Sequence, residues 1–312
     1  MREKIFSIIL FIIIICFIPI FITTLVKGIP KSNQQEKVKK SIKVLVDGNQ
    51  MDVDLDNYLI GVVAAEMPIN FYEDALKAQA VAARTFTLKK IEYDKNHIFI
   101  NNEQAFLTKE DMEVRWGTDN FAKNYNKIRN AVMETKSEVI TYKEDLIEAV
   151  FHSTSGGKTQ SAKDVWGEDI PYLVSVNSLE DINSPEYIHK QVFSQQELSD
   201  KIKEHIDDFK VYSNDISREI QIISRTQEGY VSQVQIGNKI LKGETFRNYL
   251  GLESSNFTFN NVDGKIEILC KGYGHGVGMS QYGADNLAGK GYNYKEILKY
   301  YYTNTEISVI KN

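Results

Sequence analysis

Hydrophobic positions follow two different spacings along this chain. Alternating apolar and polar residues on both sides of Asp47-Gly48 predict a β-hairpin, and the same alternation recurs twice, so we expect hairpins over residues 42–55, 138–153 and 257–272. Apolar residues at helical spacing predict helices over residues 56–66, 72–90 and 121–134. The two kinds of element mix without a regular βαβ alternation. We therefore expect an α+β fold in which mixed sheets pack against helices.

The later part of the chain predicts an inserted lobe over residues 178–250. It begins with a charged helical piece at 194–206, continues with strands at 218–225 and 230–237, and ends near the stretch 243–251. An amphipathic helix at 293–302 and a strand at 306–310 follow. The expected architecture is a two-lobed domain, residues 42–312, with a central cleft.

The first residues have a different composition. No charged side chain occurs from Ile5 to Val26, and roughly 20 apolar residues cross a bilayer as a helix. We expect residues 1–26 to be a transmembrane anchor, uncleaved because no small-x-small cleavage site follows. Residues 27–41 are a lysine-rich, flexible tether. Positive charges on the two sides of the span favour the opposite orientation, but long domains translocate regardless of nearby charge, so we expect residues 42–312 to be extracytoplasmic.

Charge and cysteine content exclude several classes of protein. A formal net charge of -5 argues against a nucleic-acid binder, which needs a basic surface. The two cysteines, Cys16 and Cys270, lie in different regions, so neither a disulfide framework nor a thiolate metal cluster is expected. The glycine-rich stretch near residue 275 lacks the Lys-Ser/Thr of a phosphate loop, and neither G-x-S-x-G nor H-E-x-x-H occurs.

Glu66 is the first candidate for chemistry. On a helix it shares the apolar stripe of Leu59, Val62 and Val63, and Pro68 ends the helix just beyond it. A carboxyl group held against apolar side chains has a raised pKa, which suits a general acid near neutral pH. The alternative is an exposed glutamate at a frayed helix end, and the local pattern leaves both readings open.

Three other segments carry polar candidates. Arg84 lies on the alanine-rich helix after Glu66, where it either contacts a substrate oxygen or is a solvated helix charge. His152 ends a strand before hydroxyl residues that flank Gly156-Gly157. In residues 271–291, glycines alternate with Tyr273, His275 and Val277; if extended, this segment exposes those three side chains on one face, and otherwise it is a glycine-rich bend.

Five motifs in order resemble one known family. They are YLIGVVAAEMP, ALKAQAVAARTFTL, FHSTSGGKTQSAKDVWG, PYLVSV and GYGHGVGMSQYGADNLAGKGYNYKEILKYYYTNTEI. Together, over residues 42 to 312, they are similar to the stage II sporulation protein D family and its relatives, the amidase enhancers. The resemblance implies a membrane-bound lytic transglycosylase that cuts peptidoglycan glycan strands during forespore engulfment. It also implies partners, the sporulation proteins P, an amidase, and M, at the mother-cell membrane facing the septum.

The resemblance also implies roles for individual residues. Glu66 matches the family's catalytic acid and Arg84 the arginine of the following helix, while Thr159 and Tyr172 match positions that line the family's cleft. Val174 replaces a lysine common after PYL. Some relatives bind zinc with a His and Cys cluster, but here the thiolates are missing, His97 and Gln104 remain, and the His-Cys pair is Asn102-Glu103. We therefore expect no zinc and no cofactor.

These observations lead to one hypothesis and two rivals. Glu66 acts as acid and then as base while the sugar's own 6-hydroxyl closes a 1,6-anhydro ring. The expected substrate-binding residues are Arg84, Gln104, His152, Ser155, Thr159, Tyr172, His275, Gln281 and Tyr282. One rival is a non-catalytic cell-wall-binding activator of an N-acetylmuramoyl-L-alanine amidase. The other is a structural membrane protein of the engulfment machinery with a vestigial cleft.

Overall fold

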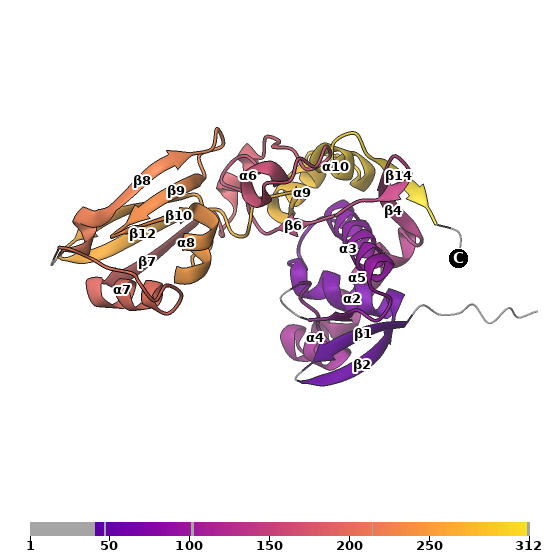
Figure 1. Ribbon diagram of the computed structural model, residues 1–312. Coiled ribbons are helices and arrows are strands. Elements are labelled where there is room, and N and C mark those ends of the chain that lie inside the picture. The colour runs from indigo at the N-terminus through magenta and orange to yellow at the C-terminus, as the bar shows by residue number, and fades with distance from the viewer. Residues whose placement is uncertain (1–40, 47, 101–102, 214, 311–312) are drawn as a thin grey trace, which may run out of the picture. The chain divides into compact units, whose positions relative to one another are not determined.

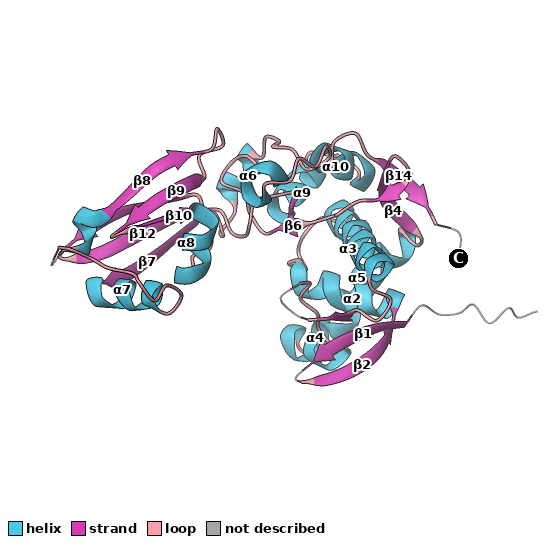
Figure 2. Cartoon of the chain, viewed as in Figure 1, coloured by secondary structure: helices cyan, strands magenta, loops and turns pink. Residues whose placement is uncertain are grey.

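The computed structural model describes residues 41–46, 48–100, 103–213 and 215–310. Helices and short sheets are interspersed along this part of the chain, as Figure 2 shows. Antiparallel strand pairs predominate. The expectation of an α+β fold is confirmed.

The first sheet begins with the predicted hairpin. Strand β1 (Ser41–Val46) pairs antiparallel with β2 (Asn49–Asp54), and Val46 faces Asn49 at the turn. Gly48 lies in this turn with a φ of 77°, a left-handed conformation that glycine adopts at no steric cost. Strand β3 (Ile98–Phe99) joins the other edge of β1 in parallel.

The three helices predicted from apolar spacing form the centre of a first hydrophobic core (Figure 1): α2 (Leu55–Glu66), α3 (Glu73–Tyr93) and α5 (Thr118–Glu134). The carboxylate of Asp54 accepts hydrogen bonds from the N–H groups of Asp56 and Asn57, which fixes the start of α2. Because α3 is rich in alanine, its neighbours approach closely. These neighbours are α2, α5, α9 (Gln281–Gly289) and α10 (Tyr294–Tyr301).

Short helices absent from the predicted set connect these elements. α4 (Lys109–Trp116) begins with a capping box in which Thr108 and Asp111 satisfy each other's main-chain N–H groups. Others are α6 (Ala162–Trp166) and the 3-10 helices η1 (Leu179–Asn183) and η2 (Ile216–Glu219). The sequence analysis also did not assign α8 (Gly243–Leu250) and α9 as helices. Such helices are too short for a clear period, so the sequence pattern does not show them.

Two small sheets complete the first core. One has the order β14 (Glu306–Val309), β4 (Glu138–Tyr142) and β5 (Asp145–Leu146). The predicted hairpin over residues 138–153 is only partly right, because its second strand stops at Leu146. Beyond it, β6 (Phe151–His152) pairs in parallel with β13 (Met279–Ser280), so that Ser280 lies beside His152. This pairing brings two motifs far apart in the sequence into one place.

A second hydrophobic core contains buried residues from Phe193 to Cys270. Its sheets have the orders β10-β9-β8 and β11-β12-β7, and the helices α7 and α8 pack on these strands (Figure 1). The bounds are β7 (Ile188–Ser194), α7 (Gln195–Lys203), β8 (Ile220–Arg225), β9 (Val231–Ile236), β10 (Lys239–Lys242), α8 (Gly243–Leu250), β11 (Phe257–Val262) and β12 (Lys265–Lys271). The predicted hairpin over 257–272 is confirmed, and its strands belong to this core. The lobe boundaries 178–250 stay a prediction.

The glycine-rich segment is not extended. Gly272, Gly274, Gly276 and Gly278 all have positive φ, between 73° and 112°. A Cβ on Gly278 would lie 2.1 Å from the carbonyl oxygen of Val150. These left-handed residues break the alternation of a strand, so Val277 is fully buried whereas Tyr273 is 45% exposed. The expected common face of Tyr273, His275 and Val277 does not form.

The predicted membrane anchor lies outside the described residues, as does the tether except for Ser41, which begins β1. Within the part of the chain that the structure describes, the helices are too short or too polar to span a bilayer.

Candidate active site

Glu66 is the last residue of α2 and lies half-buried where the helix stops. Met67 is extended, with φ of -115°, and Pro68 follows. One carboxylate oxygen, Oε1, accepts a hydrogen bond of 2.7 Å from the main-chain N–H of Ala105. The other, Oε2, accepts a longer one of 3.3 Å from the side-chain amide of Gln281.

Burial raises the pKa of Glu66 above its ordinary value, because the charged form loses hydration. The hydrogen bonds from Ala105 and Gln281 act in the opposite direction, since they stabilise the carboxylate. The local sequence left open an exposed, frayed glutamate, and the structure does not adopt that arrangement. A carboxyl group in this environment suits proton transfer near neutral pH.

Gln281 and Tyr282 begin α9, which the hydroxyl of Ser280 caps at the N–H of Gly283. The N–H of Tyr282 donates to the carbonyl of Ser153, and the Tyr282 ring meets the edge of Phe71 with centroids 4.9 Å apart. Phe71 lies in the loop that follows Glu66. The first and last motifs of the sequence therefore meet here, and Glu66, Gln281 and Tyr282 belong to one site.

His152 and His275 form an aromatic cluster with Trp166, a residue that the sequence analysis did not single out. The ring centroids of the two histidines are 5.7 Å apart, and those of Trp166 and His275 are 5.6 Å apart. Burial, reinforced by the neighbouring His275, lowers the pKa of His152 to about 3. Burial and the charge of Arg247 lower the pKa of His275 to about 4. Both rings are therefore neutral at physiological pH, and neither acts as a cationic acid.

The ring contacts of the two histidines are internal. Nδ1 of His152 faces the carbonyl of Val277 at 3.1 Å, so it carries the proton, and Nδ1 of His275 accepts from the N–H of Val277 at 3.1 Å. Nε2 of His152 is buried and has no hydrogen-bond partner within the described residues. These contacts hold the glycine-rich segment against β6.

Ser155 and Thr159 are fully buried in the loop after β6, and their hydroxyl groups accept hydrogen bonds from main-chain N–H groups. Ser155 accepts from the N–H of Gly157 at 3.1 Å, and Thr159 accepts from the N–H of Val176 at 2.9 Å. They shape the loop, and their expected contacts with substrate stay predictions.

Asp181, which no motif indicated, organises the same loop from η1. Its carboxylate accepts the N–H of Ser155 at 2.7 Å. Burial raises the pKa of Asp181, while hydrogen bonds involving Ser155, Ser280 and Ser178 lower it. The carboxyl group thus holds the start of the loop after β6 against η1.

Arg84 does not reach Glu66. Its guanidinium is 1% exposed and donates to the carbonyls of Val132, Thr135 and Glu138, at 3.0, 2.8 and 3.1 Å. Burial lowers its pKa to about 10, so the group stays charged. The reading of a solvated charge is therefore wrong: the buried guanidinium holds the end of α5 and the start of β4 together, and the expected contact of Arg84 with a substrate oxygen stays a prediction.

Tyr172 and Gln104 also have internal partners. The Tyr172 hydroxyl accepts from the N–H of Glu148 at 3.1 Å, and its ring lies beside Tyr142. Gln104 is 2% exposed and bonds to Tyr58 and Thr87 in place of a ligand. Gln104 directly precedes Ala105, so it belongs to the surroundings of Glu66, whereas Tyr172 does not contact that site.

No group of three or more His, Cys, Asp or Glu side chains gathers to hold a metal within the described ranges. His97 Nε2 lies 3.0 Å from Glu103 Oε2, so these two side chains pair with each other. Asn102 lies outside the described residues.

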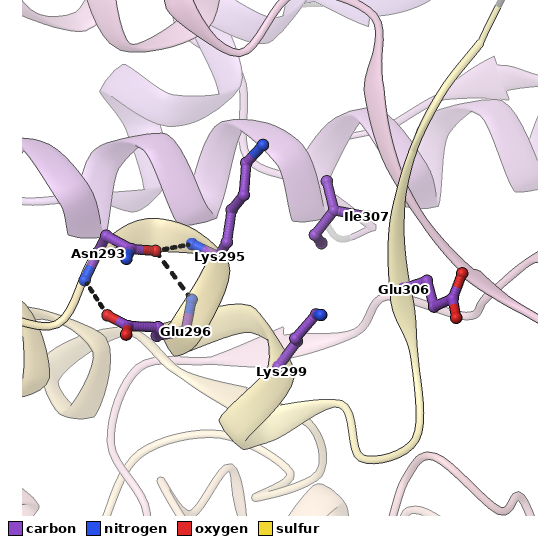
Figure 3. Close-up of a pocket in the computed structure, with 6 residues that line it drawn as sticks. All are labelled: Asn293, Lys295, Glu296, Lys299, Glu306 and Ile307. Atoms are coloured by element: carbon purple, nitrogen blue, oxygen red, sulfur yellow. Dashed lines mark hydrogen bonds between the residues drawn. The ribbon is translucent and has the colours of Figure 1, made fainter.

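A cavity of about 380 Å³ lies between α10 and β14 (Figure 3), and none of the candidate residues is among those that line it. It is lined by Asn293, Lys295, Glu296, Lys299, Glu306 and Ile307. Lys295 also pairs with Glu138 at 2.9 Å. Since side chains of both signs line it, the cavity indicates no particular ligand.

The fold and the site define a class of protein: an α+β domain with one half-buried acid between its first and last motifs. The family model of SpoIID, stage II sporulation protein, matches residues 48–142. Stage II sporulation protein D of Bacillus amyloliquefaciens is 39% identical over 265 residues, 82% of this chain and 75% of that protein. Stage II sporulation protein D of Bacillus subtilis (strain 168) is 37% identical over 298 residues, which cover 91% of this chain and 84% of that protein.

The amidase enhancer of Bacillus subtilis (strain 168) is also similar, 28% identical over 300 residues, which cover 80% of this chain and 40% of that protein. The chain belongs to the stage II sporulation protein D family. The resemblance stated from the motifs is confirmed.

Proposed function

We propose that this protein is a peptidoglycan lytic transglycosylase in which Glu66 is the single acid and base. The observation that carries the proposal is the state of that carboxyl group: burial raises its pKa, and one N–H and one amide hold its two oxygens. Within the described residues, the hydrogen-bond partners of the Glu66 carboxyl group are a main-chain N–H and a side-chain amide, with no second carboxylate among them. Conventional glycosidases use a second carboxyl group about 5–9.5 Å away, whereas the sugar's own 6-hydroxyl lets a lytic transglycosylase work with one.

The hydrogen bonds indicate which oxygen carries the proton. Oε1 must keep a lone pair toward the N–H of Ala105, so in the neutral acid the proton resides on Oε2. Oε2–H protonates the glycosidic oxygen between N-acetylmuramic acid and N-acetylglucosamine, and the bond from C1 to that oxygen breaks. The 6-hydroxyl oxygen of the muramic acid residue then bonds to C1 and gives its proton to the carboxylate. The products are a 1,6-anhydro end and a free hydroxyl, and Glu66 is again neutral.

Gln281 suits both protonation states of Glu66. As oriented, its Nε2 donates to the carboxylate. With the amide rotated by half a turn, which leaves its shape unchanged, its oxygen accepts the proton of the neutral acid. Tyr282 follows Gln281 on α9, and His152 pairs with Ser280, the residue before Gln281. Tyr282 and His152 are therefore the proposed surroundings of the glycan strand.

The biological setting is part of the proposal. Membership of a family of sporulation proteins supports a role in forespore engulfment, with peptide-free glycan as substrate. We propose an N-terminal anchor in the mother-cell membrane, an extracytoplasmic domain facing the septum, and complexes with the sporulation proteins P and M.

A second candidate function is non-catalytic activation of a cell-wall amidase. The similarity to a protein named amidase enhancer supports it. A pure activator has no need of a half-buried acid, because burying a carboxylate costs free energy. The enzymatic proposal therefore accounts for Glu66 better.

The experiment is to incubate the full-length protein, purified in detergent, with peptide-free glycan strands and to analyse the products by mass. Anhydro ends with the wild type and none with Glu66→Gln support the proposal. Hydrated reducing ends would show that the protein hydrolyses the glycosidic bond, and they would overturn the lytic transglycosylase proposal. No products, combined with faster turnover of an added amidase, would establish the activator.

A further inference from the structure

Gln104 is tied to two helices in a dry environment. Its Oε1 lies 3.1 Å from the hydroxyl of Tyr58 on α2 and 3.0 Å from the hydroxyl of Thr87 on α3. Its Nε2 makes a longer contact of 3.4 Å with the carbonyl of Ala83. Tyr58 and Thr87 are fully buried and Gln104 is 2% exposed. Buried hydrogen bonds of this kind hold their members in one arrangement.

Each partner of Gln104 is itself held in place. The ring of Tyr58 stacks on Phe106 with centroids 5.5 Å apart and lies 5.4 Å from Phe99. Burial raises the pKa of Tyr58 far above its usual range, so the hydroxyl keeps its proton and donates. The single proton of Thr87 is shared between Gln104 and the carbonyl of Ala83, which lies 2.8 Å away.

The same segment carries the donor to Glu66. Ala105 directly follows Gln104, and its N–H lies 2.7 Å from Glu66 Oε1. Two residues further on, the N–H of Leu107 donates to the carbonyl of Gly61 at 3.2 Å. A Cβ on Gly61 would lie 2.3 Å from the Phe106 ring, so only glycine permits this close approach to α2. Ala105 is therefore held on both sides against the helix that ends in Glu66.

We propose that Gln104 is a positioning residue: through Tyr58 and Thr87 it fixes the Ala105 N–H on Oε1 of Glu66 and so directs the acid's proton to Oε2. This inference rests on the proposed function of Glu66 and replaces the expected contact of Gln104 with substrate. When the hydrogen bonds of Gln104 are lost, the Ala105 N–H moves away from the Glu66 carboxylate. The carboxylate then loses a stabilising hydrogen bond, and the pKa of Glu66 rises further.

Other titratable groups lie near Glu66, and most have hydrogen-bond partners of their own. The titratable and charged side chains on the surrounding elements include Tyr58, Glu103, Arg115, Lys127, Tyr282 and Asp285. Lys127 donates to the carbonyls of Ile69 and Phe71 in the loop after Glu66. Arg115 donates to the carbonyls of Ala64 and Ala65, and Glu103 pairs with His97. Burial raises the pKa of Asp285, whose carboxylate accepts the N–H of Tyr72. Apart from Tyr58, which donates to Gln104 Oε1, none of these groups bonds to Gln104.

The test compares Gln104→Met, Tyr58→Phe and Thr87→Val in the full-length protein. Thr85→Val is the matched control, because Thr85 is equally buried on α3 but accepts from the N–H of Ile140 on β4. The pKa of Glu66 is followed by carbon NMR of protein labelled at glutamate carboxyl groups, with the signal assigned by its absence in Glu66→Gln. Glycan cleavage is measured against pH in parallel.

We expect a higher Glu66 pKa in the three network variants and an unchanged one in Thr85→Val, even where the control loses as much thermal stability. We also expect kcat to fall by up to about 100-fold, the scale of a 1 Å misplacement, and the alkaline limb of the pH profile to move to higher pH. Misplacement without loss of substrate binding leaves KM nearly unchanged.

An unchanged Glu66 pKa in Gln104→Met overturns the inference. If that variant does not fold, Tyr58→Phe decides, since it keeps the packed ring and removes one hydroxyl. The NMR measurement does not depend on activity. If the Glu66 pKa shifts in the variants but the wild type cleaves no glycan, the proposed function is refuted and the positioning role of Gln104 is kept. If the wild type cleaves glycan but the pKa does not shift, the proposed function is kept and the positioning role is refuted.

Discussion

The side chains of Glu66 and Gln281 meet at 3.3 Å although 215 positions separate them in the chain. The contact joins the end of α2 to the start of α9, which pack against α3. It places an amide that can donate or accept beside a carboxyl group whose pKa burial raises. This relationship, together with the N–H of Ala105, is the basis of the predictions that follow.

Replacing Glu66 by glutamine removes the proton donor and keeps the shape. We expect kcat for glycan cleavage to fall at least about 10²- to 10⁴-fold, as is typical of general acid catalysis, while glycan binding is retained. Product release by mass analysis and binding by sedimentation with purified sacculi check this. Cleavage at the wild-type rate would remove Glu66 from the mechanism.

The same substitution should stabilise the protein at neutral pH. The folded-state pKa of Glu66 lies above its ordinary value of 4.5, so this group favours the folded state below 4.5 and loses that contribution as pH rises through the folded pKa. Glutamine does not ionise, so Glu66→Gln does not lose this stability as the pH rises. We expect a gain of about 0.5–2 kcal/mol in the free energy of unfolding at pH 7.5, and a smaller gain at pH 4.5. Urea denaturation at the two pH values measures it; an equal gain at both would argue against a raised pKa.

Replacing Gln281 by leucine removes the amide that faces Oε2. We expect the pKa of Glu66 to rise, because one of the hydrogen bonds that favour the carboxylate is lost. We also expect kcat to fall by roughly 10- to 100-fold while KM changes little. The pH profile of cleavage checks both. Asn286→Leu, five residues later on α9, is the control and should keep the wild-type profile.

Arg84 should prove to be a stability residue. Arg84→Met leaves the carbonyls of Val132, Thr135 and Glu138 without their guanidinium donor, at a cost of at least about 2 kcal/mol in the free energy of unfolding. The folded fraction should keep its kcat. The exposed Arg129 on α5 supplies the control, since Arg129→Met should change stability by less than about 0.5 kcal/mol. Loss of kcat in fully folded Arg84→Met would restore the ligand role.

The histidine pair should make the protein sensitive to acid. Their folded-state pKa values, about 3 for His152 and about 4 for His275, lie below the ordinary 6.5. Their contribution is complete above 6.5 and is lost as pH falls toward those values, because the unfolded chain binds more protons. Glu66 and Asp181 act in the opposite direction, so the comparison must be between variants.

We expect His152→Gln to be less stable than the wild type at pH 7.5, and to lose less stability than the wild type between pH 7.5 and pH 5. Urea denaturation at both values measures the difference, with the exposed His205→Gln as control. Identical slopes for His152→Gln and the wild type would contradict burial of a neutral ring at this position.

Local patterns predicted most of the regular elements. The hairpin turn at Gly48, the three central helices and the position of Glu66 at the end of α2 all follow from residues within a few positions of one another. Residue type alone did not predict which polar side chains face inward. From the sequence, Arg84 is expected to contact substrate or to be a solvated charge, and the family resemblance places Gln104 among the substrate-binding residues. Distant main-chain carbonyls and hydroxyls satisfy both side chains inside the core.

By itself, the sequence determined the helix that carries the acid, the proline that ends it, and the order of motifs that places the chain in its family. Only the tertiary structure decided that Ala105 and Gln281 hold the two oxygens of that acid, and that the alternating glycines bend instead of forming a strand. Helices and turns depend on neighbours in the chain. The burial and hydrogen bonding of a side chain depend on groups that meet only when the whole domain has folded, and these interactions decide what Glu66 can do.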